Sequence, residues 1–257
     1  MAAQQVIMSL VFQDPTYQLQ LNIGIIMALP KLNTPTYELT LPSTGVKIRY
    51  RPFLVKEHKI LLTLANADNN EVARIIRELT DVCTFNALKV HELPHFDIEY
   101  IFMNLRARSI GETVEVIVNC ECGNKIDTSF NINDLKVETK PNHSNKINLT
   151  ENIGVEMRYP TLEEVMGVFE SNDNQKVIDL VISNVKTIYS ADESWEAVDQ
   201  TRTELEEFIY SLTKEQFDQL ETFFVTSPKV VQVIESDCPA CGKHNTSRLE
   251  GLQNFFA

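Results

Sequence analysis

The sequence predicts an α+β fold, in which a body of β-hairpins and helices is interrupted by a C-terminal helical insertion. Apolar residues alternate at every second position in several short segments, and they recur at helical spacing in others. Four of the five cysteines form two close pairs, each placed where a predicted strand ends. A chain of 257 residues that is 43% hydrophobic can bury a core, in one large domain or two small ones.

The first strongly patterned segment is predicted to be a β-hairpin. Tyr37, Leu39 and Leu41 alternate with polar residues, and the same alternation returns over residues 46–50. Between these segments, residues 43–45 read Ser-Thr-Gly, a sequence typical of a turn. The two strands are therefore expected to pair with each other.

Three helices are predicted to follow this hairpin, at residues 54–66, 70–83 and 96–109. The second of them places its apolar residues and Cys83 on one face, which is typical of a helix that packs on a core. Cys83 is therefore expected to be a core residue rather than part of a site.

Strands are predicted on both sides of the first cysteine pair. Residues 112–120 carry alternating valines and lead into this pair, and residues 125–132 are the natural return strand. A further hairpin is predicted over residues 147–159, with its turn at residues 152–154, where the sequence reads Asn-Ile-Gly.

Helical patterns dominate residues 161–226. Capping-box patterns, in which Ser or Thr precedes Glu or Gln by three residues, mark predicted helix starts at Thr161, Thr203 and Thr213. An apolar stripe at helical spacing covers residues 178–185. After this region the period returns to two and leads into the second cysteine pair.

These patterns divide the chain into four segments. They are an N-terminal extension at 1–26, an α+β body with the first cysteine pair at 27–160, a helical insertion at 161–226, and a strand with the second cysteine pair and an apolar tail at 227–257. The insertion would account for the long separation of the two cysteine pairs.

The two cysteine pairs predict a structural zinc site with Cys120, Cys122, Cys238 and Cys241 as its ligands. Each pair is followed by a glycine, which can adopt the positive φ that lets backbone N–H groups approach a thiolate. Two such turns facing each other supply four sulfurs at the corners of a tetrahedron, as in a zinc-ribbon-like pair of knuckles. The Cys-x-x-Cys spacing of the second pair is usual for this role, and the Cys-x-Cys spacing of the first is one residue shorter.

Three other states of these cysteines remain open. The pairs could form one or two disulfides, Cys238 and Cys241 could act as a redox pair, or all four cysteines could be buried without a ligand. The first residues lack the basic region and the cleavage site of a signal peptide, which favours a reducing cytosol. In that compartment paired cysteines hold metal more often than they form disulfides.

Charge and motifs exclude several function classes. The formal net charge is −13, which disfavours binding to nucleic acid or to an anionic membrane surface, because both normally require a basic face. The sequence has no apolar stretch of the length of about 18 residues that a transmembrane helix requires. It also lacks the common nucleotide-binding and hydrolase motifs, so no catalytic residue is predicted. The alternative class is a metal- or thiol-dependent enzyme that uses Cys238 and Cys241.

Three long stretches carry a resemblance to a known family. They are LPSTGVKIRYRPFLVKEHKILL (41–62), FDIEYIFMNLRARSIGE (96–112) and LTKEQFDQLETFFVTSPKVVQVIESDCPACGKHNTSRLEGLQNFF (212–256). The chain resembles the hub and central-spike baseplate assembly proteins of T4-type contractile-tailed phages over about residues 27–257. The resemblance implies a non-enzymatic role in building the baseplate hub, as a chaperone or a minor component, with other hub or tail proteins as partners. It implies a place in the host cytoplasm during assembly or in the virion baseplate.

The resemblance also bears on the start of the chain. The stretch MALPKLNTPTYELTLPSTG resembles the beginning of family members, which predicts that translation starts at Met27 rather than at Met1. The alternative is a genuine N-terminal arm over residues 1–26 that adds an edge strand or reaches a partner.

The apolar C-terminal residues predict a partner-binding surface for hub assembly. Its expected members are aromatic and aliphatic residues at the end of the last predicted helix and at the end of the chain: Phe223, Phe224, Leu252, Phe255 and Phe256. Exposed apolar patches of this kind mark interaction sites. The alternative is that the tail folds back and fills the core of the protein itself.

Overall fold

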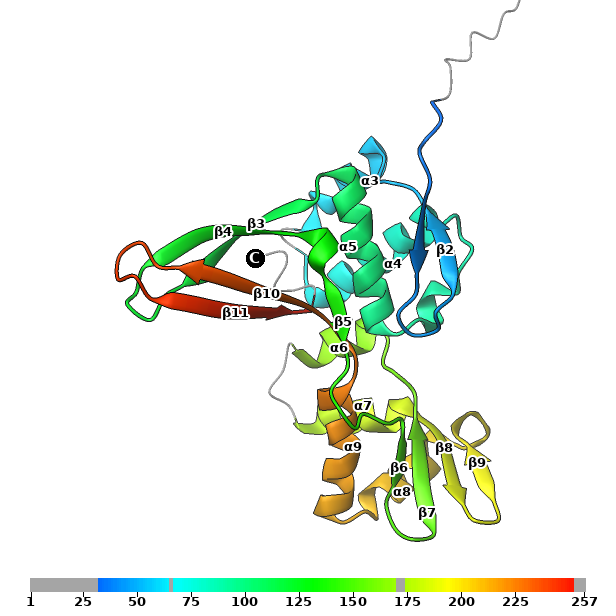
Figure 1. Ribbon diagram of the computed structural model, residues 1–257. Coiled ribbons are helices and arrows are strands. Elements are labelled where there is room, and N and C mark those ends of the chain that lie inside the picture. The colour runs from blue at the N-terminus through cyan, green and yellow to red at the C-terminus, as the bar shows by residue number, and fades with distance from the viewer. Residues whose placement is uncertain (1–31, 65–66, 170–173, 252–257) are drawn as a thin grey trace, which may run out of the picture. The chain divides into compact units, whose positions relative to one another are not determined.

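The computed structural model describes residues 32–64, 67–169 and 174–251 (Figure 1). Residues 35–257 form one compact unit, and every helix and strand described below belongs to it. These elements are helices and small antiparallel sheets, so the predicted α+β class is confirmed. The predicted extension at residues 1–26, and with it the choice between Met1 and Met27, lies outside the described residues.

The first hydrophobic core lies among four helices and three small antiparallel sheets of the described chain. The helices are α3 (Val55–Leu61), α4 (Asn69–Cys83), α5 (His95–Ser109) and α6 (Leu162–Phe169). The strands are β1 (Tyr37–Thr40), β2 (Lys47–Tyr50), β3 (Thr113–Asn119), β4 (Lys125–Asn131), β5 (Lys136–Glu138), β10 (Lys229–Asp237) and β11 (His244–Glu250).

The predicted first hairpin consists of β1 and β2, and its turn is fixed to α5. Ile48 and Tyr50 are buried while the residue between them faces solvent, as the alternation predicts. In the turn, the backbone N–H of Ser43 donates to one carboxylate oxygen of Asp97 (3.0 Å), and the Ser43 hydroxyl donates to the other. Burial raises the pKa of Asp97, and the two hydrogen bonds from Ser43 oppose that shift. The hairpin is thereby anchored on the first turn of α5.

The predicted helices α4 and α5 form the centre of this core. The side chain of Asp68 caps α4 by accepting a hydrogen bond from the backbone N–H of Glu71 (2.8 Å). The predicted apolar face of α4 is buried, and Cys83 is fully buried within it. The side chains of α5 are buried on almost all sides, including Phe96 and Phe102, which is typical of a helix surrounded by other elements.

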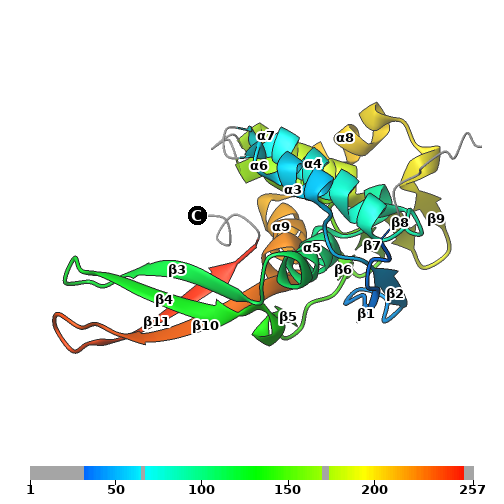
Figure 2. The same ribbon diagram turned by 90° about the horizontal axis from the view of Figure 1, so that it is seen from above.

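Two long hairpins, β3–β4 and β10–β11, run side by side away from the helices (Figures 1 and 2). Near the turn of the first hairpin, Val118 lies opposite Ile126, and both side chains are buried. β10 pairs with β11 on one edge and with β5 on the other. The strand that leads into the rest of the chain, β5, therefore lies beside the strand that returns from it, β10.

A second hydrophobic core lies between β5 and β10 in the sequence. Its strands form one antiparallel sheet in the order β6-β7-β8-β9. The elements are β6 (Lys146–Asn148), β7 (Ile153–Met157), α7 (Asn174–Asn184), β8 (Val185–Ser190), β9 (Ser194–Glu196), α8 (Arg202–Tyr210) and α9 (Lys214–Thr226). Its most deeply buried side chains include Val155, Val181 and Leu220, each 0% exposed.

The predicted helical insertion at residues 161–226 is not wholly helical. Val185, the last residue of the predicted helical stripe, instead begins β8, and β9 follows at Ser194. β-Branched residues favour strands when a partner strand is present, and β8 is paired on both edges, with β7 and with β9. The second core therefore combines strands from both sides of residue 161.

The hairpin predicted over residues 147–159 forms, but its turn lies earlier than predicted. The hydroxyl of Thr150 accepts a hydrogen bond from the backbone N–H of Ile153 (3.0 Å), which is already the first residue of β7. Gly154 pairs with Tyr189 of β8, and a Cβ atom at Gly154 would lie 2.3 Å from the Tyr189 ring. This glycine therefore makes room for an aromatic ring and does not form the turn.

Two of the three predicted capping boxes are found at their predicted places. Thr161 caps α6 and Thr213 caps α9. The helix predicted to begin at Thr203 is instead capped by Thr201, whose side chain accepts a hydrogen bond from the backbone N–H of Glu204. Two Thr-x-x-Glu patterns overlap here, and Thr201 has the extended backbone that a capping residue requires.

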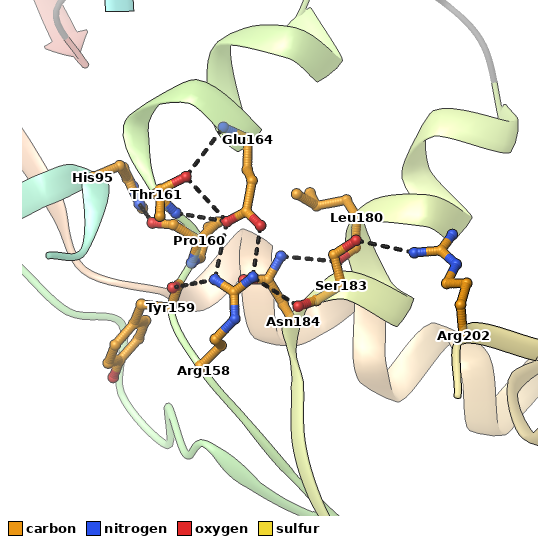
Figure 3. A network of polar contacts seen from close by, with 10 residues as sticks. All are labelled: His95, Arg158, Tyr159, Pro160, Thr161, Glu164, Leu180, Ser183, Asn184 and Arg202. Atoms are coloured by element: carbon orange, nitrogen blue, oxygen red, sulfur yellow. Dashed lines mark hydrogen bonds and ion pairs between the residues drawn. The ribbon is translucent and has the colours of Figure 1, made fainter. Parts of the chain in front are cut away.

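The connection between β7 and α6 passes from the second core to the first, and Arg158 holds it in place (Figure 3). The Arg158 guanidinium donates to both carboxylate oxygens of Glu164 (3.0 and 2.6 Å) and to the carbonyl oxygen of Ser183 (2.7 Å). Glu164 also accepts a hydrogen bond from the backbone N–H of Thr161 (2.8 Å). Burial raises the pKa of Glu164, but Arg158 and Thr161 outweigh burial and hold the pKa below its usual range. One arginine thus joins the end of β7, the start of α6 and the end of α7.

Candidate metal centre and apolar cavity

The cysteine pairs lie in the turns of the two long hairpins, and both turns close in the same way. In the β3–β4 turn, the N–H of Gly123 donates to the carbonyl oxygen of Cys120 (2.9 Å). In the β10–β11 turn, the N–H of Gly242 donates to the carbonyl oxygen of Cys238 (2.8 Å). Both glycines have a positive φ, 87° and 71°, a conformation that other residues rarely adopt. The first turn closes over one residue fewer, which accommodates its shorter Cys-x-Cys spacing.

The two turns bring the four sulfurs together. All four Sγ atoms lie within 4.8 Å of one another. The Sγ atoms of Cys120 and Cys241 are 3.7 Å apart, and those of Cys122 and Cys238 are 3.6 Å apart. Four thiolates bound tetrahedrally at about 2.3 Å from an ion lie about 3.8 Å from one another. The four cysteines can therefore hold one metal ion.

None of the five cysteines, all of which lie among the described residues, forms a disulfide. The shortest sulfur–sulfur separation in the cluster is 3.6 Å, far longer than a disulfide bond of about 2.05 Å. Cys120 and Cys238 are 5% and 2% exposed, whereas Cys122 and Cys241 face solvent. The cluster therefore has one side against the hairpins and one side open to water.

The backbone prepares one of these thiols for ionisation. Burial raises the pKa of Cys238, but hydrogen bonds from the N–H groups of Cys241 and Ala240 outweigh burial and lower the pKa to about 6. At Cys241 the N–H of Lys243 lowers the pKa, but the neighbouring thiols outweigh it and raise the pKa to about 12. Since the thiolate is the form that binds a metal, these backbone N–H groups favour the metal-binding form of Cys238.

Polar side chains link the two turns around the cluster. Lys243 of the second hairpin forms an ion pair with Glu121 of the first (2.5 Å). The side-chain amide of Asn124 lies within hydrogen-bonding distance of the Cys238 sulfur (3.7 Å). His244 is not a member of the metal-ligating group and instead pairs with the carboxylate of Asp237 (2.8 Å). The candidate donor set therefore consists of sulfur alone.

An open apolar cavity of about 680 Å³ is lined by residues of α5, α6, α7 and α9, with β10 and the end of β11 at its rim. Val165, Val177 and Leu180 contribute to its apolar wall. His95 of α5 also lines it, with Nδ1 3.3 Å from the carbonyl oxygen of Pro160. Sequence reasoning missed this cavity because its wall is assembled from helices that are distant in the chain and carry no shared motif.

The residues predicted to bind a partner lie in different environments. Phe223 is 2% exposed and stacks on Tyr159 and His143 in the second core, with ring centroids 5.3 and 5.2 Å apart. Phe224 is half-buried and lines the apolar cavity, as does Gly251. The remaining members lie outside the described residues: Leu252, Phe255 and Phe256.

Comparisons with known proteins agree with the resemblance. A family model described as "T4 bacteriophage base plate protein" matches residues 34–257. A search of the curated proteins finds no match to the chain, and a search of the solved structures finds none. Within the described part of the chain, no helix has both the length and the apolar character needed to cross a membrane.

Proposed function

The chain belongs to the T4 bacteriophage base plate protein family, and from this premise we propose that it is a non-enzymatic protein of baseplate assembly. The observation that carries the proposal is the family match over residues 34–257. The resemblance of three long stretches to hub and central-spike assembly proteins favours the hub of a contractile tail as its place of action. Its partners would be other hub or tail proteins, and it would act in the host cytoplasm during assembly, as a chaperone or as a minor baseplate component.

Complementation tests this role. A phage that lacks this chain is expected to produce no infectious particles and to accumulate incomplete baseplates, and the chain supplied in trans should restore both. Quantitative mass spectrometry of purified particles then separates the two forms of the role, because a chaperone is absent from the particle and a component is present at a fixed copy number. Normal baseplates in the absence of the chain would refute the proposal.

We further propose that Cys120, Cys122, Cys238 and Cys241 bind one structural zinc ion. The sulfur separations of 3.6 and 3.7 Å and the all-cysteine donor set support this assignment, because soft thiolates favour zinc and a closed set of four is typical of structural sites. A filled four-sulfur site has no open position for a substrate. This argues against the alternative of a metal-dependent enzyme.

Elemental analysis tests the zinc assignment. Freshly purified protein is expected to contain one zinc ion per chain, and Cys241→Ser is expected to lose it. Cys83→Ala is the matched control, because Cys83 is buried in the first core and does not belong to the cluster. Zinc-free wild-type protein, or equal zinc in Cys241→Ser and the control, would reject the assignment.

We propose that the partner surface includes Phe224 at the apolar cavity and the C-terminal residues Leu252, Phe255 and Phe256. Phe223 would support this surface from the second core, because its ring packs directly against Phe224 with centroids 5.1 Å apart. Aromatic side chains supply much of the binding energy at protein interfaces. In the complementation test, Phe255→Ser/Phe256→Ser is expected to fail, while the neighbouring change Gln253→Ser/Asn254→Ser should assemble normally. Full activity of Phe255→Ser/Phe256→Ser would show that the C-terminal tail is not part of the partner surface.

A further inference from the structure

We propose that, until a partner binds, the chain's own C-terminal tail, residues 252–257, occupies the apolar cavity. The tail reads Leu-Gln-Asn-Phe-Phe-Ala, so it carries three large apolar side chains within six residues. The cavity has a volume of about 680 Å³ and a largely apolar wall, to which Glu99, Glu221 and Lys229 add charged groups. Open apolar surfaces of this kind mark sites that bind another segment or molecule.

The structure places Gly251, the residue before the tail, in the lining of the cavity. β11 ends at Glu250, and the next residue, Gly251, itself lines the cavity. Gly251 has a φ of 73°, in the left-handed region, which turns the chain out of the direction of the strand. Its N–H donates to the carbonyl oxygen of Val230 (3.2 Å), so the residue before the tail is held at the cavity.

The tail is also long enough to cross the cavity. Six extended residues span about 20 Å, which is more than twice the edge of a cube with the cavity's volume of about 680 Å³. The tail can therefore place its phenylalanines against the far wall.

The wall matches the tail in chemistry. Val165 and Val168 come from α6, Val177 and Leu180 from α7, and Phe224 from α9. These side chains offer apolar contacts to leucine and phenylalanine. A segment tethered at the rim has an effective concentration in the millimolar range. A modest intrinsic affinity is therefore enough for it to occupy the cavity ahead of a segment of another molecule.

Hydrogen exchange on the purified full-length chain tests the proposal. In Phe255→Ser/Phe256→Ser, the amides of the cavity wall at residues 177–180 and 221–225 are expected to exchange at least tenfold faster than in the wild type. The matched control, Gln253→Ser/Asn254→Ser, should leave these rates unchanged. The exchange of β3 and β4, which do not line the cavity, reports whether either variant has lost its fold.

A synthetic Leu-Gln-Asn-Phe-Phe-Ala peptide provides the second measurement. It is expected to bind Phe255→Ser/Phe256→Ser with one site per chain and to slow the exchange of the cavity wall, and not to bind the wild type. Adding Val177→Arg to the phenylalanine variant should abolish this binding, because an arginine then stands in the cavity wall. Val198→Arg, at a residue that is 90% exposed and outside the cavity, should not affect it.

Two outcomes would overturn the proposal. One is equal exchange of the cavity wall in the wild type and in Phe255→Ser/Phe256→Ser. The other is wild-type protection that disappears on dilution together with a dimer in sedimentation, because the occupant would then be the tail of a second copy. These measurements use the purified protein alone, so their failure would leave the assembly role untouched.

Discussion

The cysteine turns and the second core hold their parts of the chain together by different means. The second core contains fully buried side chains such as Leu220, which is 0% exposed. The long hairpins bury only one face against the first core: in β3, Val118 is buried but Ile117 is 60% exposed. A two-stranded ribbon buries too little apolar area to be stable by itself. The proposed metal ion at the four sulfurs would tie the two turns together where little apolar area is buried.

The largest expected effect separates these two regions directly. Removing the proposed zinc ion with a chelator, or by Cys238→Ser, should release the ends of both hairpins, because structural zinc contributes on the order of 10 kcal/mol of apparent binding free energy. Hydrogen exchange is expected to accelerate in the turns at Cys120–Gly123 and Cys238–Gly242 and to remain slow in α9. Equal acceleration in the turns and in α9 would show that the second core also depends on the metal ion.

Removing a buried side chain from the second core should lower the stability of the protein and leave the metal site intact. Phe223→Ala is expected to lower the free energy of unfolding by about 3–5 kcal/mol, as is usual for removing a buried phenylalanine ring, without changing the zinc content. Denaturant unfolding combined with elemental analysis measures both quantities. Val198→Ala, at a residue that is 90% exposed, is the control and should have almost no effect. Loss of zinc in Phe223→Ala would mean that the two regions depend on each other.

Acid should weaken the structure through His95, which lies beside the passage between the two cores. Burial lowers the pKa of His95 to about 4, and the charge of Lys229 acts in the same direction. In the unfolded chain the histidine has a pKa of about 6.5 and is protonated before the buried His95 of the folded chain. The free energy of unfolding therefore falls as the pH decreases from about 6.5 to about 4. The loss can reach about 3 kcal/mol.

The pH dependence of denaturant unfolding measures this effect. Between about pH 6.5 and 4.5, the free energy of unfolding should depend less on pH in His95→Asn than in the wild type. The exposed His91 serves as the control, and His91→Asn should retain the wild-type slope. An unchanged slope in His95→Asn would show that His95 is not the group responsible.

The smallest expected effect concerns the start of α8. Thr201→Ala should lower the free energy of unfolding by about 1 kcal/mol, because it removes the hydroxyl that accepts from the backbone N–H of Glu204. Thr203→Ala, two residues further into the helix, should have little effect. Thermal unfolding of the two variants compares them directly. A larger loss of stability for Thr203→Ala would show that Thr203 caps the helix, as the sequence predicts.

The sequence was sufficient wherever the signal was local. The hairpin around residues 43–45, the core face of α4 and the closure of each cysteine turn follow from local spacing, because neighbouring residues determine them. The two cysteine pairs are distant in the chain, and their meeting was inferred from the ligand number of a zinc site. β8 was missed because its valine at position 185 continues a helical stripe, and only pairing with β7 and β9 makes it a strand. Gly154 was misinterpreted for the same reason, since its partner Tyr189 is distant in the chain.

The apolar cavity and the Arg158 network could not be predicted at all. Each is assembled from elements of both cores, and no single segment of the sequence contains enough of either to form a pattern. Long-range assembly of this kind leaves its trace only in the folded structure.

The pairing of β5 with β10 has a consequence for the order in which a ribosome-bound chain can fold. Everything between these strands, including the second core, emerges before β10, and all elements of the second core are then available to it. The first core must wait for β10 to join β5, and Cys120 and Cys122 must wait for Cys238 and Cys241. Contacts between such distant residues form slowly. The nascent chain therefore exposes an unfinished first core, with two unpaired thiols, beside a completed second one.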